Sequence, residues 1–369
     1  MTSTPPPTAA ATDSPRAASP VTRSWAELLS GLLDGRDLTD ANTAWVMDQV
    51  VRGEATTAQI AGFLTALRAK TETSSEVCGL VNALARYGTK VTIPGPTVDI
   101  VGTGGDRTGA VNISTMAAIV AAATGVTVVK HGGRAASSSS CGAADLVEQL
   151  GVSLELTPSQ AARIAAEAGI TFLFAPIYSP ALHHVAAVRR ELAVPTVFNI
   201  LGPVINPANP GHQVVGVADA RMMPVLADVL AARGCSALVV RGQDGLDKLT
   251  TAATSQVWIV RDGIARATLL DPRELGVPRV EPAALRGGGA ASNARIVRNL
   301  LNGQHGPVRD VVLLNAAAAL VAVAPSGACL IEQLAAGMAQ CAEAVDSGAA
   351  KATLNRWITV TRETTKADT

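Results

Sequence analysis

The sequence predicts an α/β protein in which a small helical domain precedes a larger α/β domain with a central, mostly parallel sheet. Apolar residues recur at helical spacing from Trp25 to about Tyr87, and Pro94 and Pro96 then mark a linker. Beyond the linker, short Val/Ile-rich runs alternate with alanine-rich helical stretches, the pattern of a parallel sheet covered by helices. A chain of 369 residues, 48% of them hydrophobic, can bury a core of that size.

The helical domain is expected over residues 25–93, and its breaks carry recognisable signals. Gly53 is expected to end one helix, and Thr73 with Glu76 has the spacing of a capping box at the start of another. Residues 1–24 are rich in Pro, Ala, Ser and Thr and have almost no large apolar side chains. Such a segment cannot bury enough apolar surface to order, so we expect a disordered tail.

The α/β domain is expected over residues 94–369. Thr157 and Gln160 form a second capping-box pair around Pro158, which predicts a helix after Leu156. The β-branched apolar runs predict strands at 98–101, 126–129, 171–174, 213–217, 237–240 and 256–260.

Composition excludes several classes of function. Formal net charge is zero, there is no long basic run, and aromatic residues are only 3% of the chain, so nucleic acid is not an expected partner. The five cysteines are odd in number and form no C-x-x-C pair, which argues against a disulfide framework and a zinc site and favours the cytoplasm. The apolar segment from Val311 to Val323 is too short to cross a bilayer, so no membrane role is expected.

Two polar loops follow two of the predicted strands and are the most informative stretches of the chain. The first contains Gly-Thr-Gly-Gly-Asp at 102–106 and Asn-Ile-Ser-Thr at 112–115, and the second runs from Lys130 to Ser138. Alone, the first loop could be an ordinary glycine turn followed by an N-cap serine. Two loops rich in glycine, hydroxyls and a lysine at carboxyl ends of neighbouring strands instead favour a polyphosphate site.

These motifs closely resemble those of the anthranilate phosphoribosyltransferases, whose pattern is GTGGD, then Asn-Ile/Val-Ser-Thr, then KHGNR with a serine run and a following Asp. The similarity runs from Trp25 to the C-terminal helices and includes the segments 174–176, 188–192 and 199–207. It implies the nucleoside phosphorylase/phosphoribosyltransferase fold, with part of 180–210 joining the helical domain. It also implies a homodimer formed through that domain.

The resemblance implies that phosphoribosyl pyrophosphate binds with Mg²⁺ between the domains and that its phosphoribose moves to the amino group of anthranilate in tryptophan synthesis. Lys130 and Arg189 would be the catalytic residues, with Arg189 receiving the anthranilate carboxylate. Ser114 and Asp247 would serve Mg²⁺. The residues expected to bind substrate are Gly102, Gly105, Asp106, Asn112, Ser114, Thr115, Lys130, His131, Gly132, Gly133, Arg134, Ser137, Ser138 and Arg189.

The chain departs from the family pattern mainly on the acceptor side. Gly133 replaces an asparagine, Ser179 replaces a histidine, and Lys248 replaces the glutamate of a paired Asp-Glu. Lys248 could neutralise pyrophosphate or point into solvent. These changes leave two alternatives open: a paralogue that uses another aromatic carboxylate, or a catalytically weak binding or regulatory relative. A pyrimidine-nucleoside phosphorylase is disfavoured because its Ala-Leu-Arg-Asp segment is missing.

Overall fold

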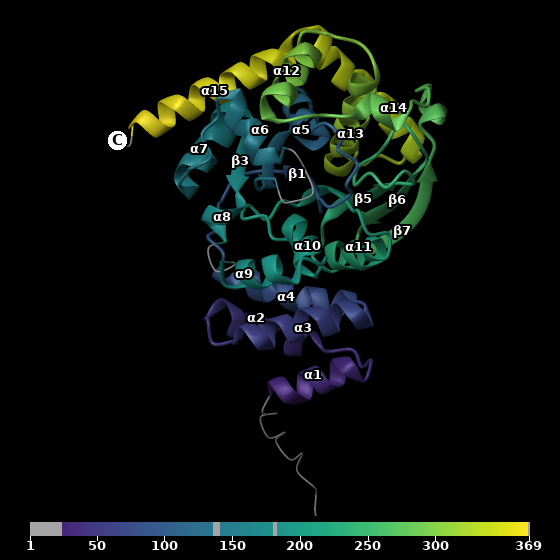
Figure 1. Ribbon diagram of the computed structural model, residues 1–369. Helices are drawn as coiled ribbons and strands as arrows, with labels where there is room; N and C mark the ends of the chain where they lie inside the picture. The colour runs from purple at the N-terminus through teal and green to yellow at the C-terminus, as the bar shows by residue number, and fades with distance from the viewer. Residues whose placement is uncertain (1–23, 136–140, 180–182, 368–369) are drawn as a thin grey trace, which may run out of the picture.

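The computed structural model describes residues 24–135, 141–179 and 183–367. The predicted tail therefore lies outside the described residues except for Ser24, whose hydroxyl caps the first helix by accepting a hydrogen bond from Glu27 N. Figure 1 shows a layer of helices at the N-terminal end of the molecule, followed by a sheet with helices on both faces. The predicted class, a helical part plus a mostly parallel α/β part, is confirmed.

The N-terminal layer contains helices α1 (Trp25–Leu33), α2 (Asp40–Val51), α3 (Thr57–Lys70) and α4 (Ser74–Tyr87). The predicted capping box at Thr73 and Glu76 is present, because each side chain bonds to the backbone N–H of the other residue. Gly53 follows the end of α2 with φ +70°, as its predicted role requires. Local sequence signals therefore set the starts and stops of this layer.

The sheet has seven strands in the order β3-β2-β1-β4-β5-β6-β7. Strands β1 to β5 are parallel, and β6 and β7 form an antiparallel edge. The sequence predicted the first six strands and missed β7, whose side chains are mostly exposed and do not alternate with the period of a strand. The strands are β1 (Thr97–Gly102), β2 (Thr127–Gly132), β3 (Ile170–Phe174), β4 (His212–Gly216), β5 (Ser236–Gly242), β6 (Ser255–Arg261) and β7 (Ile264–Leu270).

Alternate residues of the central strands enter two different cores. Ile100 and Val214 pack with the helices of one face, while Val101 and Val215 join a core that includes the N-terminal helices. The predicted capping box at Thr157 and Gln160 starts α7. The first face carries α5 (Ile113–Ala123), α6 (Ala143–Leu150), α7 (Pro158–Ala168), α12 (Ala290–Leu301), α13 (Pro307–Val323), α14 (Leu330–Asp346) and α15 (Ala349–Ala367).

The second face meets the N-terminal layer through α11 (Met222–Ala232), which contacts α4. The short α8 (Ala175–Tyr178) follows β3, and α9 (His183–Leu192) and α10 (Phe198–Leu201) lie between β3 and β4 in the sequence. Helix α9 contacts α2 and α3 although more than a hundred residues separate it from them. Within the described residues, no helix has the length and apolar character needed to cross a membrane.

The packing of α2 against α4 leaves no room for a side chain at Gly79. A Cβ placed there would lie 2.1 Å from both the carbonyl oxygen of Asp40 and the hydroxyl of Thr43. We expect Gly79→Ala to destabilise the protein by about 1–3 kcal/mol because the helices must separate. Gly62, in α3, is the matched control, since its Cβ would meet only Leu29 at 3.6 Å. Gly62→Ala should stabilise by about 0.5–1 kcal/mol through helix propensity, and urea unfolding that ranks the variants in the opposite order would contradict this account.

Candidate active site

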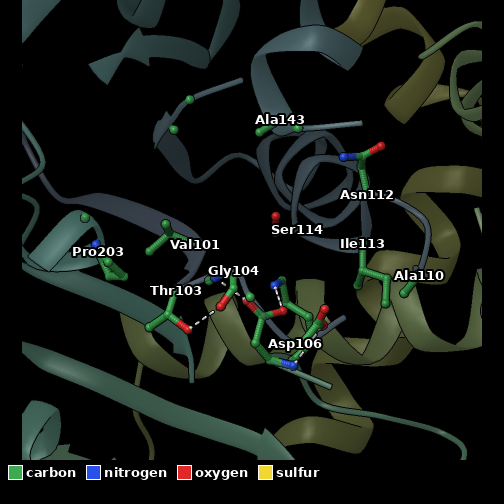
Figure 2. A pocket seen from close by; sticks show the side chains of 18 of the residues that line it. Val101, Thr103, Gly104, Asp106, Ala110, Asn112, Ile113, Ser114, Ala143 and Pro203 are labelled. Carbon is green, nitrogen blue, oxygen red and sulfur yellow. Dashed lines mark hydrogen bonds and ion pairs between the residues drawn. The ribbon is translucent and has the colours of Figure 1, made fainter. Parts of the chain in front are cut away.

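The predicted site residues gather at the carboxyl ends of β1 and β2, where the strand order reverses between β1 and β4. Such a switch point is where ligands bind in open α/β sheets. A cavity of about 440 Å³ opens there. Figure 2 shows Thr103, Gly104 and Asp106 on one side of Ser114, with Asn112 and Ala143 on the other. Of the residues expected to bind substrate, the cavity is lined by Gly102, Gly105, Asp106, Asn112, Ser114, Lys130, His131, Gly132, Gly133, Arg134 and Arg189.

The floor of the cavity depends on two paired glycines, Gly102 of β1 and Gly216 of β4. A Cβ on Gly102 would lie 2.3 Å from Asp247 Oδ2, and a Cβ on Gly216 would lie 1.5 Å from the Asp247 carbonyl oxygen. Because neither glycine has a side chain, Asp247 lies directly against both strand ends. Its Oδ2 accepts a hydrogen bond from Gly104 N at 2.8 Å. A segment far along the chain therefore holds the glycine loop.

The glycine loop adopts a backbone conformation that favours glycine. Gly104 and Gly105 adopt φ +69° and +80°, values that side chains other than glycine rarely permit. Asp106 holds the loop from within, since its carboxylate accepts bonds from the Thr108 backbone and hydroxyl and from Asp247 N. Neither glycine would meet another atom with an added Cβ, so the loop backbone is open to the cavity. Apart from Thr103 and Gly104, whose N–H groups are bonded to Gly216 and Asp247, the loop backbone can approach an anion closely.

Lys130 is buried at the end of β2 with 1% of its surface exposed. Its Nζ donates to the carbonyl of Ile100 at 2.6 Å and to Ser114 Oγ at 3.2 Å. Burial lowers the pKa of Lys130 to about 8, although the nearby Asp99 carboxylate acts to raise it. The ammonium therefore meets the cavity next to the first turn of α5, where the helix dipole also favours an anion.

His131 is buried beside Lys130 and is held in one tautomer. The carbonyl of Gly202 can only accept, so the Nδ1 that lies 3.1 Å from it carries the proton. Burial is the main reason that the pKa of His131 is lowered to about 4. Nε2 is then an acceptor, and it is buried with no hydrogen-bond partner in the described structure. A ligand N–H at the cavity could supply that partner.

Asp99 and Asn206 form a buried support for this site that the sequence analysis missed. Asp99 accepts bonds from His131 N and from Asn206 Nδ2, and Asn206 also donates to the carbonyl of Val129. Burial raises the pKa of Asp99 to about 6. The available signal was a carboxylate inside the apolar run Val98-Asp99-Ile100, because buried strands rarely contain an unpaired charge.

Asn112 and Thr115 differ in their relation to the cavity. Asn112 bridges two distant segments: its Nδ2 donates to the Cys141 carbonyl, and its Oδ1 accepts from Asn293. Asn293 also holds Gly288 N, and spacing in the sequence gave no sign of its role. Thr115 was expected to bind substrate, but its side chain is fully buried in the core and does not line the cavity. The helical turn after Asn112 points Ser114 to the cavity and Thr115 away from it.

The second loop is held by Asp145. One carboxylate oxygen of Asp145 accepts from Ala135 N and Gly142 N, each at 2.8 Å. Arg134 is exposed, pairs with Asp145 and Glu148, and lies over the Phe174 ring. Its charge is thus already matched by two carboxylates. Ser137 and Ser138, expected to bind the donor, lie outside the described residues.

On the acceptor side, Arg189 extends from α9 with its guanidinium 5.8 Å from the centre of the Phe198 ring. Both residues line the cavity. Gly133 also lines it, and a Cβ there would meet nothing within 4 Å. Ser179 does not reach this cavity; it lines a second one beside Gly88. Its difference from the family pattern therefore does not change the cavity wall directly.

Lys248 is buried with 9% of its surface exposed, so it does not point into solvent. Its Nζ donates to Asp247 Oδ1 at 2.5 Å, and a Cβ on Gly102 would lie 2.3 Å from that Nζ. Burial raises the pKa of Asp247, and the ammonium of Lys248 opposes that rise. The family's second acidic position is therefore a cation inside this cavity.

The residues present fit one magnesium ion but not a second. Ser114 Oγ and the Asp247 carboxylate are oxygen ligands of the kind that Mg²⁺ prefers, and each keeps lone pairs beyond its hydrogen bond. No three His, Cys, Asp or Glu side chains gather as a metal site within the described residues, so water and phosphate oxygens would complete the shell. Lys248 Nζ occupies Asp247 Oδ1, which leaves Oδ2 as the Asp247 oxygen for one ion, and a second ion would meet an ammonium at position 248 where the family pattern has a carboxylate.

Two family models match this chain. The helical bundle domain of the glycosyl transferase family matches residues 26–88, and the a/b domain of that family matches residues 94–351. The fold and the cavity at its switch point thus define a glycosyl transferase.

Individual relatives identify the family more specifically. The anthranilate phosphoribosyltransferase of Streptomyces griseus is 59% identical over 336 residues, covering 91% of this chain and 95% of that protein. Among solved structures, the enzyme of that name from Thermus thermophilus has a TM-score of 0.84 at 39% identity, over 91% of this chain and 99% of that one. The Saccharomyces cerevisiae enzyme in complex with phosphoribosyl pyrophosphate and Mg has a TM-score of 0.83 at 27% identity, over 92% of this chain and 98% of that one. This chain belongs to the anthranilate phosphoribosyltransferase family.

The buried imidazole generates a prediction about pH. Since the pKa of His131 is lower in the folded chain than its usual 6.5, its contribution to stability is complete above pH 6.5 and is lost as pH falls through about 4. His131→Asn keeps a donor for Gly202 and cannot titrate. We expect the free energy of unfolding of the wild type to fall by on the order of 3 kcal/mol more than that of the variant between pH 7 and pH 4. If urea unfolding gave the wild type and the variant the same loss of unfolding free energy between pH 7 and pH 4, the lowered pKa of His131 would be contradicted.

Proposed function

We propose that this protein transfers phosphoribose from phosphoribosyl pyrophosphate to the amino group of anthranilate in tryptophan biosynthesis. The observation that carries the proposal is the cavity at the β1–β4 switch point, where an open glycine loop faces two buried lysines. That combination suits a diphosphate, because backbone N–H groups and ammoniums are its natural partners. The relatives that share nearly the whole chain carry this activity in their names.

In this proposal the donor's diphosphate lies against the glycine loop, with Gly102, Gly105 and Asp106 forming the loop side. Ser114 at the start of α5 and Lys130 at the end of β2 bind it from the other side. The support is that Lys130 and Ser114 are already hydrogen-bonded to each other at the cavity. Mg²⁺ bound to Ser114, Asp247 and the phosphates would add positive charge to the leaving group.

The acceptor would lie between Arg189 and His131. The guanidinium of Arg189 suits a carboxylate, and the Phe198 ring beneath it supplies an apolar surface for an aromatic ring. Nε2 of His131, an acceptor without a partner among the described residues, would receive an N–H of the amino group. Gly133 leaves space beside these groups, where the family has an amide.

The chemistry needs no covalent intermediate with the protein. The amine nitrogen forms a bond to the anomeric carbon while the bond from that carbon to pyrophosphate breaks, and pyrophosphate leaves with the electron pair. Lys130 stabilises the charge that develops on it. A protonated aromatic amine is far more acidic than an alkylammonium, because its lone pair is delocalised into the ring, so even an imidazole with a pKa of about 4 can take its proton. Arg189 also accelerates the reaction by holding the acceptor with its amine close to the anomeric carbon.

We also propose that the enzyme is a cytoplasmic homodimer. Residues 25–93, joined by part of 180–210, would form the helical domain, and residues 94–369 the domain that binds the donor. Contacts of α9 with α2 and α3 support the joining. All five cysteines are free, as expected in the cytoplasm. A monomer mass in sedimentation would exclude the dimer.

The function is tested by following the loss of anthranilate fluorescence with phosphoribosyl pyrophosphate and Mg²⁺. We expect donor-dependent turnover by the wild type. Arg189→Ala should raise KM for anthranilate by about 10- to 100-fold, because a charge-assisted hydrogen bond to the carboxylate is lost. KM for the donor should stay close to that of the wild type.

Arg190 provides the matched control, since it is the next residue on α9, is exposed and does not line the cavity. Arg190→Ala should leave both KM values unchanged. No turnover of anthranilate by a wild-type protein that binds the donor would overturn this acceptor, and other aromatic carboxylates would then be tried. Equal effects of the two substitutions would remove Arg189 from the acceptor site.

A further inference from the structure

Lys248 has donor capacity that the protein does not use. An ammonium has three N–H donors, and within the described residues Lys248 Nζ makes a single hydrogen bond, the one to Asp247 Oδ1. The side chain is buried and lines the cavity of about 440 Å³. Burying a charge with unused donors is unfavourable unless a ligand completes its partners.

The backbone around Lys248 is fixed, so the ammonium cannot withdraw with its segment. On one side, Asp247 is held by Gly104 N and lies against Gly216. On the other, Leu249 exchanges two hydrogen bonds with the buried side chain of Asn315 on α13, at 3.1 and 2.8 Å. The side chain of Lys248 can therefore change its rotamer while its backbone stays in place, and it remains within the cavity that it lines.

Lys130 reaches the same cavity from the end of β2, with its ammonium hydrogen-bonded to Ser114. Both ammoniums reach the end of β1: Lys130 Nζ donates to the carbonyl of Ile100, and Lys248 Nζ would lie 2.3 Å from a Cβ on Gly102, two residues further along. Two neighbouring buried cations repel, and an anion bound between them removes that repulsion. A diphosphate carries enough charge to pair with both.

We propose that Lys248 is a catalytic residue whose ammonium contacts the diphosphate of the donor and takes the place of a second metal ion. The inference rests on the proposed function, since it assigns a residue to the leaving group of that reaction. When the carbon–oxygen bond breaks, the developing negative charge on pyrophosphate is met by Lys130 on one side and Lys248 on the other. The acid–lysine pair at 247–248 disfavours a further Mg²⁺. The ammonium of Lys248 instead supplies the positive charge that a second ion would bring to the leaving pyrophosphate.

The test is calorimetric binding of inorganic pyrophosphate to the full-length protein, in EDTA and then in excess Mg²⁺. We expect the wild type to bind pyrophosphate in EDTA. Lys248→Gln should weaken that binding by about 10- to 100-fold, as loss of a charge-assisted hydrogen bond predicts, and Lys248→Arg should retain most of it. Lys351→Gln, which removes an exposed lysine on α15, is the control and should bind as the wild type does.

Two results would overturn the inference: a wild type that binds pyrophosphate only with Mg²⁺, or a Lys248→Gln variant with unchanged binding in EDTA. The first comparison uses the wild type alone, so the test does not depend on the folding of a variant. Failure of the proposed function looks different. In that case pyrophosphate binds in EDTA through Lys248, but anthranilate is not consumed when the donor is supplied.

Discussion

The site depends on one close approach, that of Asp247 to the ends of β1 and β4. Gly102 and Gly216 are partners in the ladder between these strands, and both must lack a side chain for Asp247 to lie across them. From that position Asp247 orients Gly104 and receives Lys248. The glycine loop that lines the cavity is therefore held from beneath by a distant segment. A single methyl group at either glycine would displace that segment.

The second constraint is the placement of buried charge around the cavity. Asp99 and Lys130 occupy neighbouring strands under it, and Asn206 connects Asp99 to the β2 backbone. Such groups are unfavourable in a core, and a hydrophobic substitute would often be tolerated better. Here Asp99 and Asn206 anchor the β2 backbone that carries Lys130 and His131, and such anchoring is what a preorganised electrostatic site requires. The protein keeps these polar groups where the chemistry needs them.

Local signals predicted six of the seven strands, the capping boxes and the polar loop that follows β1, because each depends on residues close together in sequence. Strand β7 was missed since its exposed side chains do not alternate, although Asp262 and Gly263, both with positive φ, mark a hairpin turn before it. The burial of Lys248 and the role of Asn293 were not predictable in this way. Each depends on a partner far away in the sequence, Gly102 and Asn112 respectively, and nothing in the local pattern encodes such a pairing.

The anchoring of Leu249 by Asn315 has a consequence for the order in which the protein matures. A ribosome releases the chain from the N-terminus, so both glycine-bearing strands and the first loop leave it before the segment at 247–249 exists. Two of the hydrogen bonds that hold that segment, those between Leu249 and Asn315, can form only after α13 has been made. A nascent chain can thus contain all seven strands while the segment beneath the cavity still lacks its attachment to residue 315.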